Sequence, residues 1–231
     1  MKSDTCCLSD YITLYNSGIS VFDLNQEKLK DNKEYIAYRT KTKGNPIKLV
    51  SYKKSFKLIP YDVGIFSFYN ASNLFWAIPL ELMDNSIRGF ILRSFKDKLY
   101  RTINFTDFSL PYGFPDFDNS FDPIKNTIVL TEGTRDAMFI KSHITPYCLS
   151  INMARLGVDL INILDKFANR FLIITDMDAP GRANAKANMD SLLKEGKIVH
   201  TPTYELKDVG DYFYATTFQQ FNFINKVKSL L

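Results

Sequence analysis

The residues most able to do chemistry are two aspartates in the stretch FLIITDMDAPGR (171–182). Asp176 and Asp178 follow a run of apolar residues directly and precede a Pro-Gly pair. Like charges this close repel each other and resist burial unless a cation lies between them. The pair therefore predicts a divalent metal site, with Mg²⁺ (or Mn²⁺) as the hard cation that carboxylates prefer.

Further acids follow the neighbouring strand-like segments. Glu132 ends the segment TIVLTEG, and Asp208 and Asp211 lie in the polar stretch LKDVGDYF. In an open parallel sheet, the carboxyl ends of the strands share one edge, and loops converge there on ligands. We therefore expect these acids to meet around the metal and to leave coordination positions for phosphate oxygens. The expected metal ligands are Glu132, Asp176, Asp178 and Asp208.

Each motif taken alone also has a structural interpretation. Asp-x-Asp often caps a helix, Glu132 alone fits a solvated strand end, and KDVGD alone fits an ordinary polar loop. For Asp136, a structural role in the first turn of its helix is the better interpretation. The ordered set is what favours function: strand-Glu-Gly, then strand-Asp-x-Asp-x-Pro-Gly-Arg, then Lys-Asp-x-x-Asp.

The elements that must position these acids alternate between strand-like and helix-like segments from Lys125 onward. This alternation predicts an α/β fold with a mainly parallel sheet and flanking helices. Strands are expected at 127–133, 147–151, 170–176 and 197–201, and helices at 136–143, 157–168, 181–196 and 217–231. The helix at 181–196 is expected to open after Pro180.

The first half of the chain is less regular and predicts a smaller α+β region. Strands are expected at 34–39, 47–52 and 88–95, and 103–123 reads as a loop crowded with Phe, Pro, Asn and Asp. We therefore expect a basic amino-terminal region over 1–120, a catalytic domain over 121–215 and a carboxy-terminal helix over 216–231.

Composition limits the class of protein. The chain has 231 residues, of which 45% are apolar, and a net charge of +4, so it is expected to fold but its total charge alone does not prove a polyanionic partner. Three cysteines and two histidines form no disulfide framework or zinc-ligand spacing, which favours a reduced cytoplasm. No signal peptide and no apolar run of about 18 residues is found, so we expect neither export nor membrane insertion.

One stretch is strongly basic. Between Tyr35 and Tyr61 there is no acid, and aromatic residues are interleaved with seven basic ones: Arg39, Lys41, Lys43, Lys48, Lys53, Lys54 and Lys57. Lys and Arg follow phosphates while aromatic faces stack on unpaired bases, so this pattern predicts binding of single-stranded nucleic acid. A solvated basic face is the alternative.

The stretches TEGTRDAMF, ITDMDAPGRANA and KDVGDY resemble the three acidic motifs of the Toprim domain, which DnaG-type primases, topoisomerases and some nucleases share. The resemblance covers residues of about 125 to 214. It implies a Rossmann-like Toprim fold, with Glu132 as the catalytic glutamate, Asp176 and Asp178 as a catalytic metal pair and Asp208 as the first acid of the third motif. That motif departs from the bacterial Asp-Pro-Asp-Glu form and is more similar to phage and mobile-element primases, which leaves the role of Asp211 open.

The segment before these motifs, residues 85–114, resembles the segment that precedes Toprim in DnaG-type primases. Its alternative interpretation is a surface strand with solvated charges. The counterparts in this sequence are Arg93, Lys96, Lys98, Tyr100, Arg101, Asn104, Tyr112 and Gly113.

The resemblance implies a primase-type nucleotidyltransferase, a DNA-directed RNA polymerase that joins ribonucleoside triphosphates into short RNA primers on single-stranded DNA. Arg182 and Lys207 would contact phosphates, and Arg93, Lys96, Lys98 and Arg101 would guide the template. The sequence has neither a cysteine-rich zinc ribbon nor a Gly-x-x-x-x-Gly-Lys-Ser/Thr loop. A replicative helicase or another replication protein is therefore an expected partner, in a phage or plasmid system within the bacterial cytoplasm.

Two other functions remain open at this stage. A Toprim nuclease would use the same acids and metal to admit water in place of a 3′ hydroxyl group. A non-catalytic Toprim module would bind nucleic acid or a replication protein without chemistry. A topoisomerase is disfavoured because it needs a nucleophilic tyrosine on a separate large domain.

Overall fold

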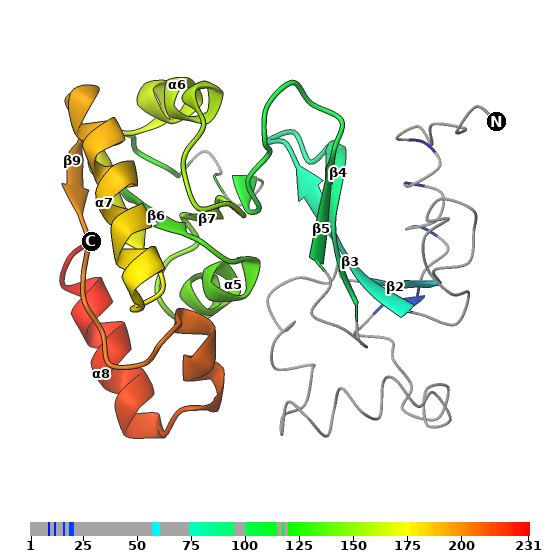
Figure 1. Ribbon diagram of the computed structural model, residues 1–231. Helices are drawn as coiled ribbons and strands as arrows, with labels where there is room; N and C mark the ends of the chain where they lie inside the picture. The colour runs from blue at the N-terminus through cyan, green and yellow to red at the C-terminus, as the bar shows by residue number, and fades with distance from the viewer. Residues whose placement is uncertain are drawn as a thin grey trace. The chain divides into compact units, whose positions relative to one another are not determined.

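The computed structural model describes most of the second half of the chain and parts of the first (Figure 1). The described residues are Ser9, Ile12, Asn16, Ile19–Ser20, 57–60, 74–94, 100–114, 117 and 120–231. The strands expected at 34–39 and 47–52, and the basic residues Lys53, Lys54, Lys96 and Lys98, lie outside these residues. Contacts divide the chain into two units, 1–80 with 87–106 and 81–86 with 107–231. The division expected at residue 120 stays a prediction.

The first unit contains a five-stranded sheet in the order β1-β2-β3-β4-β5. The strands are β1 (Ile19–Ser20), β2 (Lys57–Pro60), β3 (Leu74–Glu81), β4 (Ile87–Ser94) and β5 (Tyr100–Asn104). Antiparallel pairing joins β1 to β2, β2 to β3 and β4 to β5. The strand expected at 88–95 is thus present as β4, whereas β5 takes in the first residues of the segment expected to be a loop from 103.

Three of the basic residues expected to contact nucleic acid lie on strands of this sheet. Lys57 is the first residue of β2, Arg93 is paired with Tyr100 across β4 and β5, and Arg101 is paired with Leu92. Their role in binding stays a prediction.

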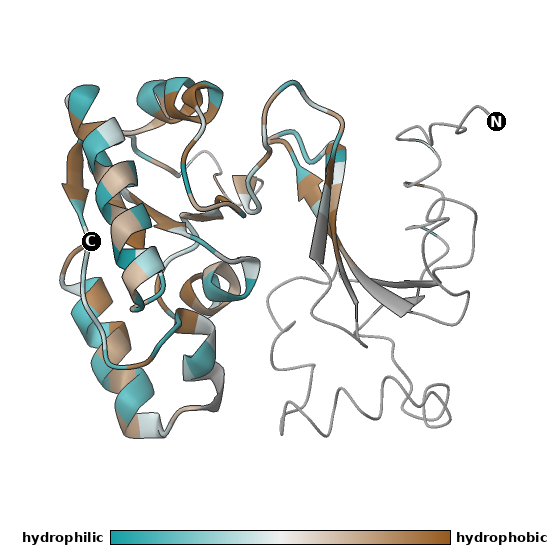
Figure 2. Ribbon diagram, viewed as in Figure 1, coloured by the Kyte–Doolittle hydropathy of each residue, from teal (hydrophilic) through white to brown (hydrophobic). Residues whose placement is uncertain are grey.

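The second unit is built on a four-stranded sheet in the order β7-β6-β8-β9, in which every pair is parallel. The strands are β6 (Thr127–Thr131), β7 (Cys148–Ser150), β8 (Arg170–Ile174) and β9 (Ile198–His200). All residues of β6 and β7 are buried, as expected for strands covered on both faces. Figure 2 shows the apolar strands beside helices of mixed hydropathy. The α/β class expected from the sequence is confirmed.

Helices cover both faces of this parallel sheet. They are α5 (Thr134–His143), α6 (Val158–Phe167), α7 (Ala179–Lys194), the 3₁₀-helix η2 (Val209–Tyr214) and α8 (Thr217–Lys228). The chain moves from β6 to β7 in one direction and from β8 to β9 in the other, so right-handed crossovers place α5 on one face and α7 on the opposite face. Accordingly, α6 packs on α7, whereas α5 packs on η2.

Two expectations for these elements need correction. Helix α7 begins at Ala179 and contains Pro180 in its first turn, where a missing N–H costs nothing, so the helix does not open after the proline. The segment expected to be a polar loop at 206–213 includes most of η2. Aromatic packing accounts for the second difference, because Tyr212 of η2 stacks on Phe223 of α8 with ring centroids 4.2 Å apart.

The segment before β6 is fixed to the edge of the parallel sheet. Tyr112 forms an antiparallel bridge with Ser150, with N–H···O distances of 2.9 Å in both directions. Gly113 has a φ of 114°, and a Cβ there would lie 2.5 Å from the Cys148 carbonyl oxygen, so only glycine fits. The buried Lys141 of α5 donates hydrogen bonds to the carbonyl oxygens of Gly113 (3.1 Å) and Pro146 (2.8 Å). Tyr112 and Gly113 therefore have structural roles here.

Candidate metal centre

The strand order places a switch point between β6 and β8. The chain leaves β6 toward β7 and leaves β8 toward β9, so the crossovers diverge at this pair and open a crevice at its carboxyl end. Thr131 and Ile174, the last residues of the two strands, are paired. Glu132 follows the first and Asp176 lies two residues after the second, so both acids stand at the switch point.

A tight turn after β8 fixes Asp176 and Asp178. A Cβ on Gly181 would lie 2.1 Å from the Asp176 carbonyl oxygen, so glycine is required for this close approach. Thr175 Oγ1 donates a hydrogen bond of 2.8 Å to the Gly181 carbonyl oxygen. Asp178 is the N-cap of α7, and its Oδ1 accepts a hydrogen bond of 3.0 Å from the Gly181 N–H. The capping interpretation of Asp178 is therefore correct, and its second oxygen, Oδ2, takes no part in the cap.

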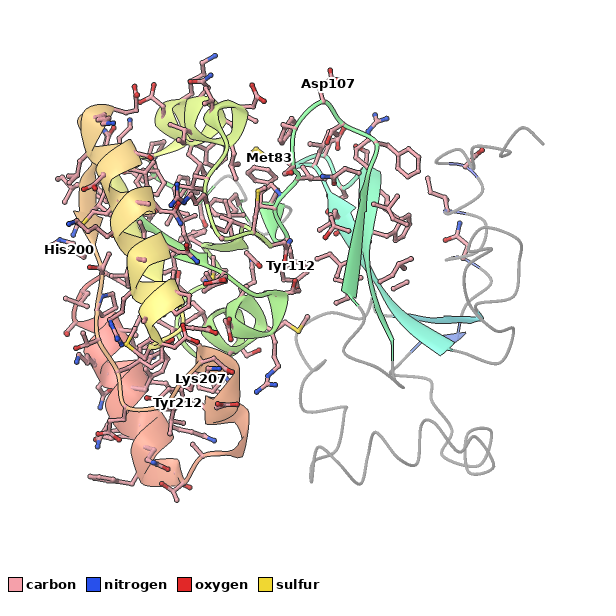
Figure 3. All side chains as sticks on the ribbon, viewed as in Figure 1. Met83, Asp107, Tyr112, His200, Lys207 and Tyr212 are labelled. Atoms are coloured by element: carbon pink, nitrogen blue, oxygen red, sulfur yellow. The ribbon has the colours of Figure 1, made fainter. Side chains whose placement is uncertain are left out.

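The loop after β9 brings the third motif to the same rim. It follows His200, the last residue of β9, and leads through Lys207 into η2, which contains Tyr212; these three residues are labelled in Figure 3. The Met177 N–H donates a hydrogen bond of 2.7 Å to the Lys207 carbonyl oxygen, and Tyr204 Oη donates one of 2.6 Å to the Thr175 carbonyl oxygen. The Asp-x-Asp turn and the residue before Asp208 are thus joined through the backbone.

The first turn of α5 holds the third motif from the other side. Asp136, which is 8% exposed, accepts a hydrogen bond of 2.7 Å from the Gly210 N–H. This contact agrees with the structural role expected for Asp136. Arg135 Nη2 lies 2.9 Å from Asp211 Oδ1 and 3.6 Å from Asp208 Oδ1. Sequence analysis missed Arg135, although its place three residues after Glu132 in the Glu-Gly-Thr-Arg-Asp stretch was a signal.

Burial and mutual repulsion dominate the electrostatics of the rim. Burial raises the pKa of Glu132, and the charges of Asp176 and Asp178 add to the shift. Burial likewise raises the pKa of Asp176, with further contributions from Asp208 and Asp178. The pKa of Asp208 is also raised, mainly by burial, although Arg135 opposes the shift. A cation would relieve the repulsion among these groups.

The carboxylates of Glu132 and Asp176 have oxygen atoms with no hydrogen-bond partner among the described residues. Glu132 Oε2 is buried and accepts no hydrogen bond there. Asp208 Oδ1, in contrast, accepts a hydrogen bond of 2.8 Å from the Asp211 N–H. Asp176 has no hydrogen bond or ion pair to any described residue. In kind, unpaired carboxylate oxygens of this type fit a hard divalent cation.

The side chains are not, however, arranged as a finished metal cage. Across residues 120–231 and the other described parts, no group of three or more His, Cys, Asp or Glu is placed to hold a metal ion. Basic side chains share the rim instead: Lys207 Nζ is 3.5 Å from Asp178 Oδ2, and Arg135 lies beside Asp208. Ligation of one ion by acids from all three loops therefore requires their side chains to turn.

The two residues expected to contact phosphates both lie at this rim. Lys207 has a side chain that is 66% exposed and forms an ion pair with Asp178. Arg182, which is exposed, donates a hydrogen bond from Nη1 to the Met177 carbonyl oxygen. The hydrogen bond from Gly181 and the charge of Lys207 lower the pKa of Asp178. Asp178 therefore differs from its three acidic neighbours, whose pKa values are raised.

No family model and no curated protein sequence matches the chain, but solved structures do. The zinc-binding and RNA polymerase domains of the Aquifex aeolicus primase match with a TM-score of 0.64 and 18% identity over 90% of this chain. The DnaG primase catalytic domain bound to single-stranded DNA matches with a TM-score of 0.62 and 16% identity over 96% of this chain and 80% of that one. The primase fragment of the bacteriophage T7 primase-helicase protein matches with a TM-score of 0.53 and 15% identity, over 79% of this chain and 69% of that one.

These likenesses show a shared fold. The chain has the mixed α/β fold of primase catalytic cores, with a parallel sheet flanked by helices. It spans 59% of the Aquifex aeolicus structure. None of the described helices is long and apolar enough to cross a bilayer.

Proposed function

We propose that the chain is a primase-like nucleotidyltransferase, which joins ribonucleotides into short RNA primers on single-stranded DNA. One observation carries the proposal: acids from three separate loops converge at the switch point of a fold that primase catalytic cores share. Burial, with a further contribution from mutual repulsion, raises the pKa of Glu132 and Asp176 there, which is costly for folding and is useful only with a cation.

The proposed metal ligands are Glu132, Asp176, Asp178 and Asp208, for Mg²⁺ or Mn²⁺. Their oxygen donors fit such an ion in kind, and the unpartnered Glu132 Oε2 and Asp176 mark where charge compensation is missing within the described residues. When bound, the ion would polarise the triphosphate and stabilise the negative charge that develops on the leaving pyrophosphate.

The side chains of the rim would perform the remaining steps. Lys207 and Arg182 would contact the phosphates of the incoming ribonucleoside triphosphate, because both carry exposed positive charge beside the acids. Glu132 would complete the metal shell or help to deprotonate the primer 3′ hydroxyl group; burial raises its pKa, which makes it a better base at neutral pH. Asp136 would keep the third motif in place through its hydrogen bond with Gly210.

Basic residues of the first half would guide the template strand. They are Arg93, Lys96, Lys98, Arg101, Lys53, Lys54 and Lys57. We further propose that the protein works with a replicative helicase or another replication protein, in the cytoplasm of a bacterium that carries a phage or plasmid. The matching bacteriophage T7 fragment belongs to a primase-helicase protein, which supports this choice of partner.

An assay with three outcomes tests the proposal. The purified chain is incubated with Mg²⁺ or Mn²⁺, labelled ribonucleotides and a single-stranded DNA template. Short RNA products are expected, and they must disappear in Asp176→Ala. Shortened template would instead identify a Toprim nuclease that uses the same acids with water, and retained binding without either product would identify a non-catalytic module.

A further inference from the structure

Arg135 and Asp211 are charged residues of the rim to which the proposed function gives no role. The guanidinium group of Arg135 forms ion pairs with both aspartates of the third motif, with Nη2 at 2.9 Å from Asp211 Oδ1 and 3.6 Å from Asp208 Oδ1. Asp208 is one of the proposed metal ligands. The guanidinium group of Arg135 therefore lies beside a carboxylate that would also attract a divalent ion.

Packing holds Arg135 in this position. Its side chain is 29% exposed and lies against Gly210, where a Cβ would come within 2.3 Å of Nε and 2.9 Å of Cγ. Asp136, the next residue of α5, binds the Gly210 N–H at 2.7 Å. The first turn of α5 and the first turn of η2 thus form one rigid contact, and the guanidinium group is fixed between the two aspartates.

We propose that Arg135 is a fixed internal cation of the third acidic motif, which competes with the divalent ion for Asp208 and so sets the metal affinity. The inference rests on the metal site of the proposed function. The inference also assigns a role to Asp211. Because Asp211 forms the shorter ion pair with Arg135, it weakens the interaction of Arg135 with Asp208. Asp211 is then a positioning residue and does not ligate the metal.

The physical reason is charge competition. A positive charge within 4 Å of a ligand carboxylate compensates its charge before the metal arrives and repels the arriving ion. The motif consequently remains stable without metal, at the cost of weaker metal binding. Asp176 forms no ion pair with a described residue, and Lys207 compensates its charge only in part, so its carboxylate supplies the negative charge that attracts the ion.

Metal affinity measured without catalysis tests this inference. Free Mn²⁺ is titrated by electron paramagnetic resonance against the wild-type chain, Arg135→Met and the control Lys125→Met. Methionine keeps an unbranched apolar stem against Gly210, and Lys125 forms a surface pair with Asp122 at 3.3 Å, so its loss changes net charge equally. Arg135→Met is expected to lower the Kd about five- to tenfold, as for removal of a partly exposed like charge, while Lys125→Met leaves it unchanged.

A double-mutant cycle with Asp211→Asn separates the two possible roles of Asp211. If Asp211 acts through Arg135, Asp211→Asn raises the Kd in the wild-type background, because the guanidinium group then pairs fully with Asp208, and has little effect beside Arg135→Met. Equal weakening in both backgrounds would make Asp211 a ligand and overturn the inference.

The remaining outcomes are also decisive. An unchanged or higher Kd in Arg135→Met overturns the inference while the proposed metal site stands. A wild-type chain that binds no Mn²⁺ removes the metal site itself, and with it the inference. Arg135→Gln provides the same test if the methionine variant fails to show a wild-type circular dichroism spectrum.

Discussion

The two ends of the parallel sheet differ in how far their buried charges are paired. At the amino end, Lys197 precedes β9 and is 8% exposed. Its ammonium group lies 2.7 Å from Asp165 Oδ1 and donates hydrogen bonds to the Asp165 carbonyl oxygen (2.8 Å) and Asn169 Oδ1 (3.3 Å). At the carboxyl end, Asp176 is half-buried among other acids and has no partner among the described residues.

This difference distinguishes a structural charge from a functional one. Lys197 uses all of its donors within the fold, so its burial is compensated and it ties α6 to the start of β9. At the other end, burial and then the charges of neighbouring acids raise the pKa values of Glu132 and Asp176, so the fold loses stability by keeping these carboxylates together. A group of buried carboxylates whose charge the protein does not fully compensate indicates that a ligand binds there.

The largest expected effect comes from Asp176→Asn, which removes the conflict and the proposed chemistry together. Primer synthesis should fall by more than about a hundredfold, since loss of residues that merely support metal ligands already costs about 10–100-fold. Without metal, the free energy of unfolding should rise by up to about 1 kcal/mol, because a repelled carboxylate becomes neutral. Urea unfolding and the primer assay measure the two effects.

Unchanged synthesis in Asp176→Asn would contradict the functional side of the comparison. A loss of stability in this variant would show that the carboxylate is compensated after all, and the two ends would then be alike.

The matched change at the amino end should have the opposite pattern. Lys197→Met leaves the Asp165 and Asn169 acceptors without their donor, so the free energy of unfolding should fall by about 2 kcal/mol. The Kd for Mn²⁺ should stay at the wild-type value, because the side chain lies at the other end of the strands. A changed Kd with unchanged stability would reverse the assignment of the two ends.

The pH dependence of stability should reveal the strained end directly. Burial raises the pKa of Asp136 from 3.8 to about 7, and the neighbouring Asp208 adds to the shift. The folded state therefore binds more protons than the unfolded state between these values, and without metal the free energy of unfolding falls as pH rises from about 4 to about 7. Above this window the contribution of Asp136 is constant.

Urea unfolding at several pH values, with and without Mg²⁺, measures this slope. Asp136→Asn keeps an oxygen acceptor for the Gly210 N–H but does not titrate, so the slope should flatten in this variant. Stability that rises with pH across the window in the wild-type chain would refute the prediction.

The smallest effect is expected at Asn152, which supports Glu132 from the end of β7. Asn152 Oδ1 accepts hydrogen bonds from Thr134 Oγ1 (2.7 Å) and Ser150 Oγ (2.8 Å), and Ser150 Oγ also lies 3.3 Å from the Glu132 carbonyl oxygen. Loss of this network in Asn152→Gly should slow primer synthesis by about tenfold, the lower end of the range for loss of a partner that supports a metal ligand.

Asn152→Ala provides the backbone control for that variant. Asn152 has a φ of 52°, which glycine adopts freely and alanine adopts at a cost of about 1 kcal/mol. Both variants should lose the same activity, and Asn152→Ala should be less stable than Asn152→Gly by about 1 kcal/mol, the backbone cost. Reduced synthesis in Asn152→Ala alone would attribute the effect to the backbone and leave Glu132 independent of the network.

Much of the fold was predictable because it depends on local patterns. The buried runs that became β6 and β8 are apolar and β-branched, and the Asp176-to-Gly181 turn carries its own proline and glycine. Since parallel strands end at one edge, the sequence order of the motifs was enough to predict that Glu132 and Asp176 lie near each other. Roles of individual residues at that edge remain predictions.

The rest depends on contacts between residues far apart in the chain. Arg135 and Asp211 are separated by 76 positions, and nothing in either local sequence indicates their pairing. The 3₁₀-helix η2 forms where Tyr212 packs against Phe139 and Phe223, so tertiary contacts override the polar sequence of the loop. Such long-range contacts also determine that Asp208 and Asp211 lie beside Arg135.

The central claim is that acids from three loops hold one divalent ion at the carboxyl end of the sheet. Anomalous diffraction from crystals grown with Mn²⁺ tests it most directly. We expect a peak within about 2.0–2.3 Å of carboxylate oxygens of both Asp176 and Asp208, the range for hard oxygen ligands of small divalent ions. A peak elsewhere, or none at this rim in crystals that contain Mn²⁺, would contradict the account.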